Sequence, residues 1–167
     1  MNTVAPGTAD SPTTVVTPNV REHDKLPPMA SRFVNVDALP WQESRYEGIE
    51  TKTLVSDSAS GLLTSLLKLA PGARLPDHEH VGVEQTWVLG GSLECGEGEC
   101  MAGNFVWRPA GSRHDAWAGP EGALLLGVFQ IPNRFYEKDG RQLDFLGEDW
   151  ERAWGAAHAH QQQALFI

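Results

Sequence analysis

The stretch Gly72-Ala-Arg-Leu-Pro-Asp-His78-Glu-His80-Val-Gly-Val-Glu84 places two imidazoles and a carboxylate within seven residues. His78, His80 and Glu84 are separated by even steps, so on an extended strand their side chains point to the same face. On a helix the two histidines would diverge by about 200°, because each residue turns the chain by about 100°. The run Thr86-Trp87-Val88-Leu89 downstream also favours a strand. The sequence therefore predicts three potential metal ligands on one side of a β-structure.

A fourth candidate ligand follows one hairpin later. The stretch Gly103-Asn-Phe-Val-Trp-Arg-Pro109-Ala-Gly111-Ser-Arg-His114 predicts a strand, a Pro/Gly turn and a histidine that opens the next strand. Three neutral imidazoles and one carboxylate suit divalent iron, manganese, nickel, copper or zinc. The alternative is that these four residues are unrelated polar groups on a solvated sheet face.

Together the two stretches resemble the paired motifs of the cupin superfamily. The first matches the pattern G-x5-H-x-H-x3-E-x6-G from Gly72 to Gly91, and the second matches G-x5-P-x-G-x2-H from Gly103 to His114. The frequent final Asn of the second motif is replaced here by Ala118. The resemblance implies an all-β fold, a small antiparallel jelly-roll barrel. It also implies one divalent metal per chain, bound by His78, His80, Glu84 and His114.

Length and composition restrict the class of protein. A chain of 167 residues, with 41% hydrophobic and 21% charged residues, suits one globular domain. The net charge of -9 and the scattered Lys and Arg residues argue against nucleic-acid binding. No apolar run approaches the roughly 20 residues that span a bilayer. The N-terminus lacks the basic and apolar regions of a secretory signal, so we expect no membrane association and a cytoplasmic location.

Turn signals divide the chain into three parts. Residues 1–30 have almost no apolar periodicity, which predicts a flexible N-terminal tail. Residues 31–147 hold short apolar segments separated by Gly and Pro, the pattern of an antiparallel barrel, with a first short strand around 33–36. Residues 148–167 carry tryptophans and alanines at helical spacing, which predicts a short C-terminal helix and tail.

Two cysteines, Cys95 and Cys100, flank a Gly/Glu segment that is typical of a hairpin tip. Two cysteines do not define a disulfide framework, and cytosolic thiols are normally reduced. We interpret them as two small side chains in a β-hairpin, with a zinc-binding or redox role as the alternative.

Strand alternation assigns the side chains around the candidate ligands. Thr86 and Val88 share the inward face of Glu84. Ala116 shares the face of His114 in the same way. Arg108 and Arg113 flank the Pro/Gly turn and could steer an anionic ligand, although either is more often a surface residue beside a tight turn. The predicted substrate-binding residues are Thr86, Val88, Arg108 and Ala116. The alternative is that such residues form only the core of a barrel.

Outward-facing tryptophans suggest self-association. By the same alternation Trp87 and Trp117 point away from the interior, and exposed aromatic patches are costly on a monomer. Cupins of this size generally associate through sheet faces, so the resemblance implies a homodimer or homotetramer.

A closer resemblance is to the ChrR-like branch of cupins, over about residues 40–132. The residues that carry it are Trp41, Gly48-Ile49, Lys52-Thr-Leu54, Ala70-Pro71-Gly72-Ala73, Gly91-Ser92-Leu93 and the run Val106-Trp-Arg-Pro-Ala-Gly-Ser-Arg-His114. This branch contains zinc-binding regulators that grip a sigma factor through a separate N-terminal zinc-binding helical domain. It also contains small non-haem Fe(II) dioxygenases that cleave β-diketones or dihydroxyacetophenone-like hydroxyketones. The leader before residue 40 has no Cys and a single His23, so it does not match the regulators' domain.

The resemblance therefore implies a metal-dependent dioxygenase whose partners are a small-molecule substrate and dioxygen. Fe(II) is the expected metal, with zinc, manganese or nickel as alternatives. The three histidines would hold the iron, while Glu84 would complete the shell or move off to act as a catalytic base. Some diketone-cleaving relatives use three histidines alone, so Glu84 departs from their pattern. Two other functions stay open: a non-catalytic cupin that binds a metal or small ligand, and a metal-dependent isomerase or lyase.

Overall fold

The computed structural model describes residues 31, 34–57, 60–130, 133–136 and 138–144. The predicted tail at 1–30 and the predicted helix within 148–167 lie outside these residues. The described part is nearly all β-strand, and the predicted all-β jelly-roll fold is confirmed. No helix in the described part is long and apolar enough to cross a membrane.

The strands follow one another with short connections. Their bounds are β1 Gln42–Glu43, β2 Ile49–Asp57, β3 Leu62–Leu69, β4 Arg74–His80, β5 Glu84–Cys95, β6 Gly98–Met101, β7 Phe105–Arg108, β8 Arg113–Gln130, β9 Asn133–Tyr136 and β10 Gln142–Asp144. The strand predicted around 33–36 is wrong where it can be compared, because Val36–Ala38 is one turn of 3-10 helix. The backbone oxygen of Val36 accepts a hydrogen bond from Lys52 Nζ at 2.9 Å, rather than pairing with another strand.

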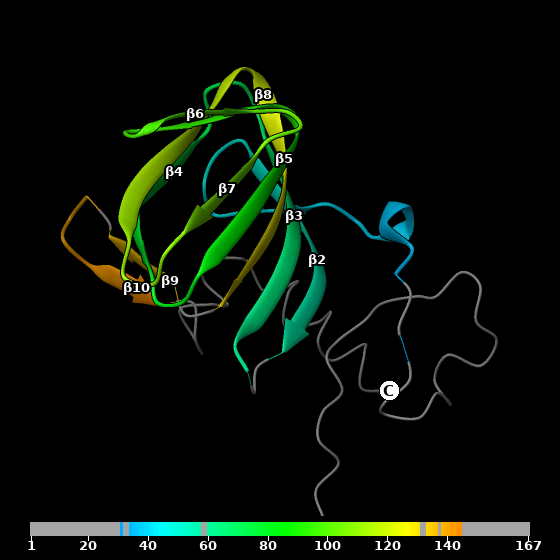
Figure 1. Ribbon diagram of the computed structural model, residues 1–167, viewed down its shortest axis with the longest axis horizontal. Coiled ribbons are helices and arrows are strands. Elements are labelled where there is room, and N and C mark those ends of the chain that lie inside the picture. Colours follow the sequence, from blue (N-terminus) through cyan, green and yellow to red (C-terminus); the bar gives the residue numbers. More distant parts are fainter. Residues whose placement is uncertain (1–30, 32–33, 58–59, 131–132, 137, 145–167) are drawn as a thin grey trace, which may run out of the picture.

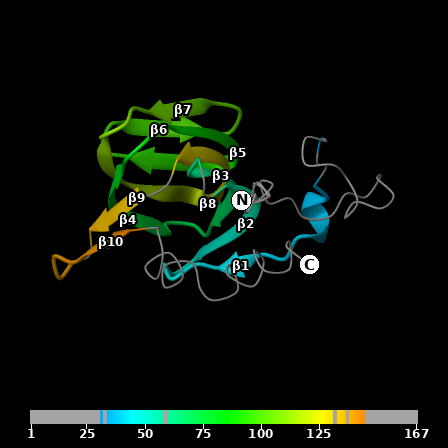
Figure 2. The same cartoon turned by 90° about the horizontal axis from the view of Figure 1, so that it is seen from below.

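Every strand pairing is antiparallel, in the order β1-β2-β3-β8-β4-β9-β10, with β5 paired to β6, β7 and β8. Figures 1 and 2 show the strands curling into a barrel, with β9 and β10 projecting at one side. The long strands β5 and β8 bend together, and their register shifts on both sides of Gly90 and Gly91. Gly91 has a φ of +65°, and a Cβ there would lie 1.9 Å from the Gly122 oxygen. Only glycine allows this close crossing.

Alternating side chains fill the interior. On β3 and on the second half of β8 every second residue is buried, as the period of a strand requires. The core cluster is made of Ile49, Leu63, Leu67, Leu69, Val88, Leu93, Ala116, Ala118, Ala123, Leu125, Phe129 and Phe135. The predicted ligands lie beside this core, on the inner faces of β4, β5 and β8.

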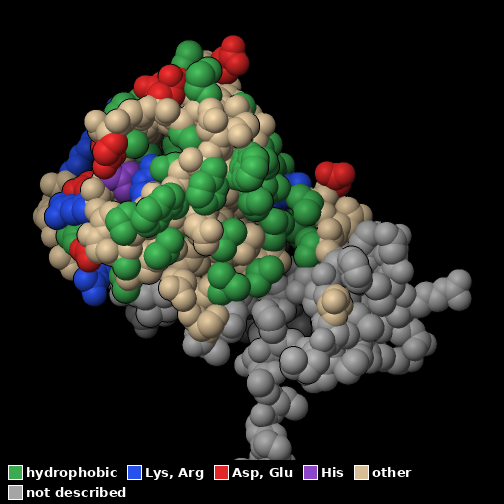
Figure 3. All heavy atoms as spheres, in the orientation of Figure 1, with side chains coloured by type: hydrophobic (Ala, Val, Ile, Leu, Met, Phe, Trp, Pro, Cys, Tyr) green, Lys and Arg blue, Asp and Glu red, His purple; other side chains and the backbone are tan. Residues whose placement is uncertain are grey.

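The outer face of β5 and β7 is apolar. Trp87 lies opposite Phe105, and Gln85 lies opposite Trp107, in the β5–β7 ladder. The three aromatic side chains are each about half exposed, and Leu89 extends the patch. Figure 3 shows hydrophobic side chains gathered over this face of the barrel.

Trp117 lies elsewhere and is covered. Its Nε1 donates to Glu94 Oε2 at 2.8 Å, and the Arg74 guanidinium lies 4.6 Å from its ring centroid. It is therefore only partly exposed and does not extend the patch.

Candidate metal centre

The four predicted ligands come from three strands that the fold brings together. His78 and His80 lie on β4, Glu84 begins β5, and His114 is the second residue of β8. His78 and His114 are direct partners in the β4–β8 ladder. One potential ligand atom from each of the four side chains lies within 4.8 Å of the others.

The turn before β8 holds the second histidine strand against the first. The Gly111 amide donates to the His80 oxygen at 2.7 Å, and the His80 amide donates to the Ser112 oxygen at 2.9 Å. Gly111 has a φ of +81°, which glycine adopts without strain. The Pro/Gly turn of the second motif therefore locks His80 and His114 into one site.

Two of the histidines are oriented by backbone carbonyls. His78 Nδ1 lies 2.8 Å from the Pro76 oxygen, and His114 Nδ1 lies 3.0 Å from the Asp115 oxygen. Because a carbonyl only accepts, each Nδ1 carries the proton and each Nε2 keeps a free lone pair. A metal-binding histidine is held in this way in proteins.

The close contact between His80 and Glu84 completes the centre. The hydrogen atoms of these side chains are too few to give every close pair of atoms in it a hydrogen bond. His80 Nε2 lies 2.7 Å from Glu84 Oε2 and 3.0 Å from His114 Nε2, yet it carries at most one proton. Glu84 Oε2 is buried and receives no well-directed hydrogen bond within the described part of the chain. Three imidazoles and a carboxylate converge here without a full set of hydrogen bonds between them. Such a group of side chains fits a divalent metal ion.

A hydroxyl and a cation also approach the carboxylate of Glu84. Thr86 Oγ1 donates to Glu84 Oε1 at 2.5 Å, and Arg108 Nη1 lies 3.6 Å from Glu84 Oε2. Arg108 reaches this position because it is the direct partner of Glu84 in the β5–β7 ladder.

Burial sets the protonation of the site. Desolvation lowers the pKa of His78 to about 3, with help from the neighbouring His114 and His80. Desolvation, followed by the charge of Arg108, also lowers the pKa of His114. Burial alone would raise the pKa of Glu84, but contact with His80, the charge of Arg108 and the Thr86 hydroxyl together lower it. At neutral pH the site therefore presents neutral His78 and His114 and an ionised Glu84, the forms that bind metals.

Two aromatic rings pack in a stack beside the candidate metal centre. The Phe135 ring stacks on His78 with centroids 4.8 Å apart and planes 7° apart, and Tyr46 stacks on Phe135 at 5.5 Å. Phe135 belongs to β9, which pairs with β4. Sequence reasoning missed Phe135 and its neighbour Asn133. Their alternation after Pro132 was the available signal, but nothing local indicates which strand they join.

A small cavity of about 40 Å³ lies beside the ligands. Its lining is formed by Leu67, Leu75, His78, His80, Glu84, Thr86, Gly127, Phe129, Asn133 and Phe135. Of the predicted substrate-binding residues, Thr86 lines this cavity and Arg108 contacts Glu84. Val88 and Ala116 face inward, as alternation predicts, but pack in the hydrophobic core.

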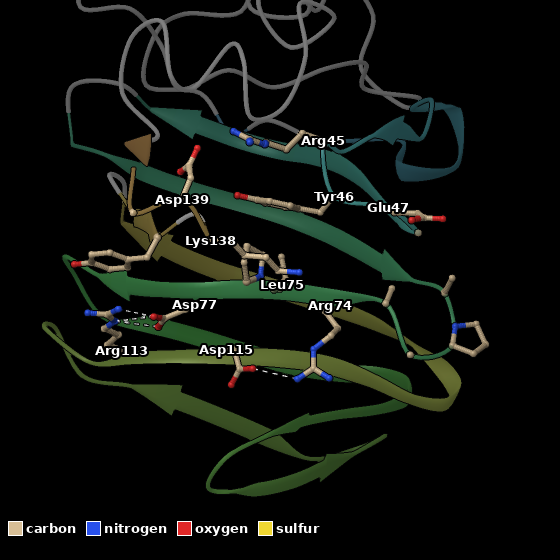
Figure 4. A pocket seen from close by; sticks show the side chains of 18 residues that line it. Arg45, Tyr46, Glu47, Arg74, Leu75, Asp77, Arg113, Asp115, Lys138 and Asp139 are labelled. Carbon is tan, nitrogen blue, oxygen red and sulfur yellow. Dashed lines mark hydrogen bonds and ion pairs between the residues drawn. The ribbon is translucent and has the colours of Figure 1, made fainter. Parts of the chain in front are cut away.

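A larger cleft of about 1180 Å³ lies between the β1–β2 loop, β4 and the β9–β10 hairpin. Figure 4 shows Tyr46 and Leu75 within it, with the ion pairs Arg113–Asp77 and Arg74–Asp115 along one side. Leu75 also lines the small cavity, so it separates the cleft from the ligands. Arg113 thus faces the cleft rather than Glu84.

The cysteines lie in the β5–β6 hairpin as free thiols. Cys95 Sγ lies 3.6 Å from the Gly98 oxygen and 3.9 Å from Arg108 Nη2. Burial raises the pKa of the Cys100 thiol, with a smaller opposing effect from Arg108. The hairpin interpretation therefore agrees with the structure, and the two thiols are not among the converging ligands.

Solved structures of other proteins share this fold. An acetylacetone dioxygenase from Acinetobacter johnsonii is 17% identical over 81% of this chain and 93% of its own, with a TM-score of 0.62. A protein from Methylibium petroleiphilum, provisionally identified as an acetylacetone dioxygenase, is 22% identical over 77% and 96%, with a TM-score of 0.64. The complex of SigE with the anti-sigma ChrR from Rhodobacter sphaeroides gives 22% identity over 57% and 51%, with a TM-score of 0.50.

At these identities the solved structures establish the fold alone. No curated protein sequence matches the chain. The family model of the ChrR cupin-like domain matches residues 29–133, which is more than half of the 167 residues. The chain therefore belongs to the ChrR cupin-like domain family.

Proposed function

We propose that the protein is a non-haem Fe(II) dioxygenase that cleaves a carbon–carbon bond of a β-diketone or hydroxyketone. The observation that carries the proposal is the convergence of three histidines and Glu84 in a buried, largely apolar pocket. The same fold in an acetylacetone dioxygenase supports this choice of reaction.

In this proposal, different residues would bind the metal and exclude water. His78, His80, His114 and Glu84 would hold the metal, and bound Fe(II) would supply the electron for dioxygen chemistry that zinc lacks. His78 and His114 are kept neutral by burial, so they are available as ligands at neutral pH. The apolar side chains Leu67, Phe129 and Phe135 would exclude water from the substrate.

Glu84 has a second role in the proposal. Thr86 contacts its Oε1 and Arg108 approaches its Oε2, the oxygen that faces His80, so the carboxylate would keep these two partners on leaving the metal. From there it would accept the proton of the carbon between the two carbonyls of a β-diketone, or that of the hydroxyl-bearing carbon of a hydroxyketone. Arg108 would then stabilise the enolate, because its charge lies beside the same carboxylate.

Substrate access calls for movement of a side chain. The cavity beside the ligands has room for one or two waters but not for a diketone. Leu75 lines both this cavity and the larger cleft, so its displacement would join them. We propose the cleft as the route of entry.

The smallness of the same cavity favours a second candidate, a non-catalytic cupin that binds a metal. One oxygen-electrode experiment separates the functions, using protein loaded with Fe(II), Mn(II), Ni(II) or zinc and a panel of β-diketones and hydroxyacetophenones. Oxygen uptake with iron but not zinc supports the dioxygenase. Turnover without oxygen supports an isomerase or lyase, and tight metal binding without any turnover supports the binding protein.

We also propose that the chain forms a homodimer or homotetramer through the outer face of β5 and β7. Trp87, Phe105, Trp107 and Leu89 make a continuous exposed apolar patch there. Such a patch on a soluble domain marks an interaction surface. Trp117 is excluded from this surface by its contacts with Arg74 and Glu94.

A further inference from the structure

Two buried polar atoms lie on the same cavity beside the metal centre. Asn133, the first residue of β9, is the direct partner of His80 in the β4–β9 ladder, so their side chains share a face. The residues are 5% and 2% exposed. Within the described part of the chain, neither Asn133 Oδ1 nor His80 Nδ1 has a hydrogen-bond partner. Each such atom costs about 1–3 kcal/mol when it is left unsatisfied.

The other two histidines differ from His80 in this respect. His78 and His114 each direct Nδ1 at a backbone carbonyl, at 2.8 and 3.0 Å. A metal-bound histidine ordinarily uses its second ring nitrogen in this way, and the partner fixes both the tautomer and the orientation of the ring. Among the described residues, His80 Nδ1 has no equivalent carbonyl partner.

The cavity that both side chains line has a volume of about 40 Å³. A water molecule needs a polar site and room for at least one probe sphere, and this cavity supplies both. We propose that one buried water bridges His80 Nδ1 and Asn133 Oδ1, and that Asn133 is a positioning residue for His80. The inference rests on the metal centre of the proposed function.

A water suits this position because it both donates and accepts. When His80 Nε2 uses its lone pair for the metal, Nδ1 carries the proton. Nδ1 then donates a hydrogen bond to the water, and the water donates one to Asn133 Oδ1. When His80 Nε2 instead turns its proton toward Glu84 Oε2, 2.7 Å away, the water donates to both Nδ1 and Oδ1. The ring can therefore change tautomer on metal binding while the amide of Asn133 stays in place.

Zinc affinity tests the role of Asn133. Asn133→Leu keeps the approximate size of the side chain and removes its hydrogen bonds, whereas Asn133→Ser keeps a hydroxyl and leaves room for the water. We expect Asn133→Leu to bind zinc about 10- to 100-fold more weakly than the parent, as loss of such a partner does elsewhere. Asn133→Ser should recover most of the affinity.

The matched control is Ser65→Ala. Ser65 is also buried, and its Oγ also has no partner within the described residues, but it does not line this cavity. Its removal should leave zinc affinity unchanged. Competition with a chromogenic chelator measures all four proteins. Unchanged affinity in Asn133→Leu, or equal losses in Asn133→Leu and Asn133→Ser, would overturn the inference.

The unmodified protein supplies an independent test if Asn133→Leu does not fold. A high-resolution crystal structure of the zinc-loaded protein should show a water within hydrogen-bond distance of His80 Nδ1 and Asn133 Oδ1. In a ¹⁵N-histidine spectrum the same protein should show a protonated His80 Nδ1. A dry cavity, or a direct bond between the two residues, contradicts the proposal. A parent protein that binds no zinc overturns the metal centre as well, whereas normal zinc binding with an unaffected Asn133→Leu overturns only this inference.

Discussion

Arg108 lies directly opposite Glu84 in the β5–β7 ladder, and its Nη1 approaches Glu84 Oε2 to 3.6 Å. The side chains are only 9% and 14% exposed, so this cation and carboxylate interact in a poorly hydrated place. Burial raises the pKa of Glu84 in the metal-free protein, and Arg108, together with His80 and Thr86, outweighs this effect.

Removing Arg108 should therefore destabilise the metal-free protein. Arg108→Met leaves a buried carboxylate without its cation, which costs on the order of 3 kcal/mol in the free energy of unfolding. It should also raise the pKa of Glu84, since Arg108 helps to lower it. Urea denaturation in the presence of a chelator measures the effect.

The control for this variant is Arg113→Met. Arg113 pairs with Asp77 on the surface, where its side chain is 52% exposed, so its loss should cost much less stability than the loss of Arg108. Equal losses of stability in the two variants would contradict the role given to Arg108.

Replacement of His80 tests the metal centre itself. We expect His80→Ala to lower the metal content well below the approximately one divalent ion per chain proposed for the parent, as measured by elemental analysis. Added metal should then no longer raise the melting temperature, because the linkage between metal binding and folding is lost.

Glu79→Gln serves as the neighbouring control for His80→Ala. Glu79 precedes His80 on β4 but faces outward, where it accepts a hydrogen bond from the Tyr136 hydroxyl at 2.8 Å. Its replacement should leave metal content unchanged. An unchanged metal content in His80→Ala would contradict the assignment of His80 to the metal site.

The metal-free protein should lose stability as the pH falls below 6.5. The pKa of His78 is about 3 in the folded protein, against 6.5 for an unperturbed histidine. Between these values the unfolded chain binds a proton that the folded chain does not, so the free energy of unfolding decreases by about 1.4 kcal/mol per pH unit. Above pH 6.5 the residue is neutral in both states and contributes no slope.

Urea denaturation with chelator at pH 7.5 and 5.5 should show this loss of stability. The expected contribution of His78 over that interval is about 1.4 kcal/mol, by the same conversion of pKa to free energy. His78→Gln should have a shallower pH dependence, because Gln does not titrate. The same slope in both proteins would show that burial of His78 does not set the acid sensitivity.

Introducing a charge into the apolar patch should disrupt self-association. Trp87→Glu places a carboxylate opposite Phe105, where the parent has two aromatic rings 6.4 Å apart. We expect light scattering to give a dimer or tetramer for the parent and a monomer for the variant at micromolar concentration. Gln142→Glu on β10, away from the patch, should keep the parent mass. A monomeric parent would argue against the proposed interface.

Much of the site was accessible from local sequence patterns. The even spacing of His78, His80 and Glu84 places them on one face of any strand, whatever that strand pairs with. The Pro/Gly turn before His114 predicted the fourth candidate ligand in the same manner. Alternation also predicted correctly that Val88 faces inward and Trp87 outward, because the period of a strand is a property of its own backbone.

Alternation says which face a residue occupies but not what lies on that face. Val88 and Ala116 point inward and yet pack in the core rather than on the cavity. Trp117 points outward and yet is covered by Arg74 and bonded to Glu94. These outcomes depend on neighbours that are distant in the sequence.

The sequence by itself therefore indicated an antiparallel barrel and the candidate ligands through short-range spacing and turn chemistry, and its resemblance to cupins implied the jelly-roll form. Only the tertiary structure decided that Asn133 and Phe135 join the site, since β9 reaches it by pairing with β4 across the barrel. It also decided that Arg108 meets Glu84, through the register of β5 and β7. Local pattern and turn geometry restrict the register of neighbouring strands, but they do not say which strands that are distant in the sequence pair with one another.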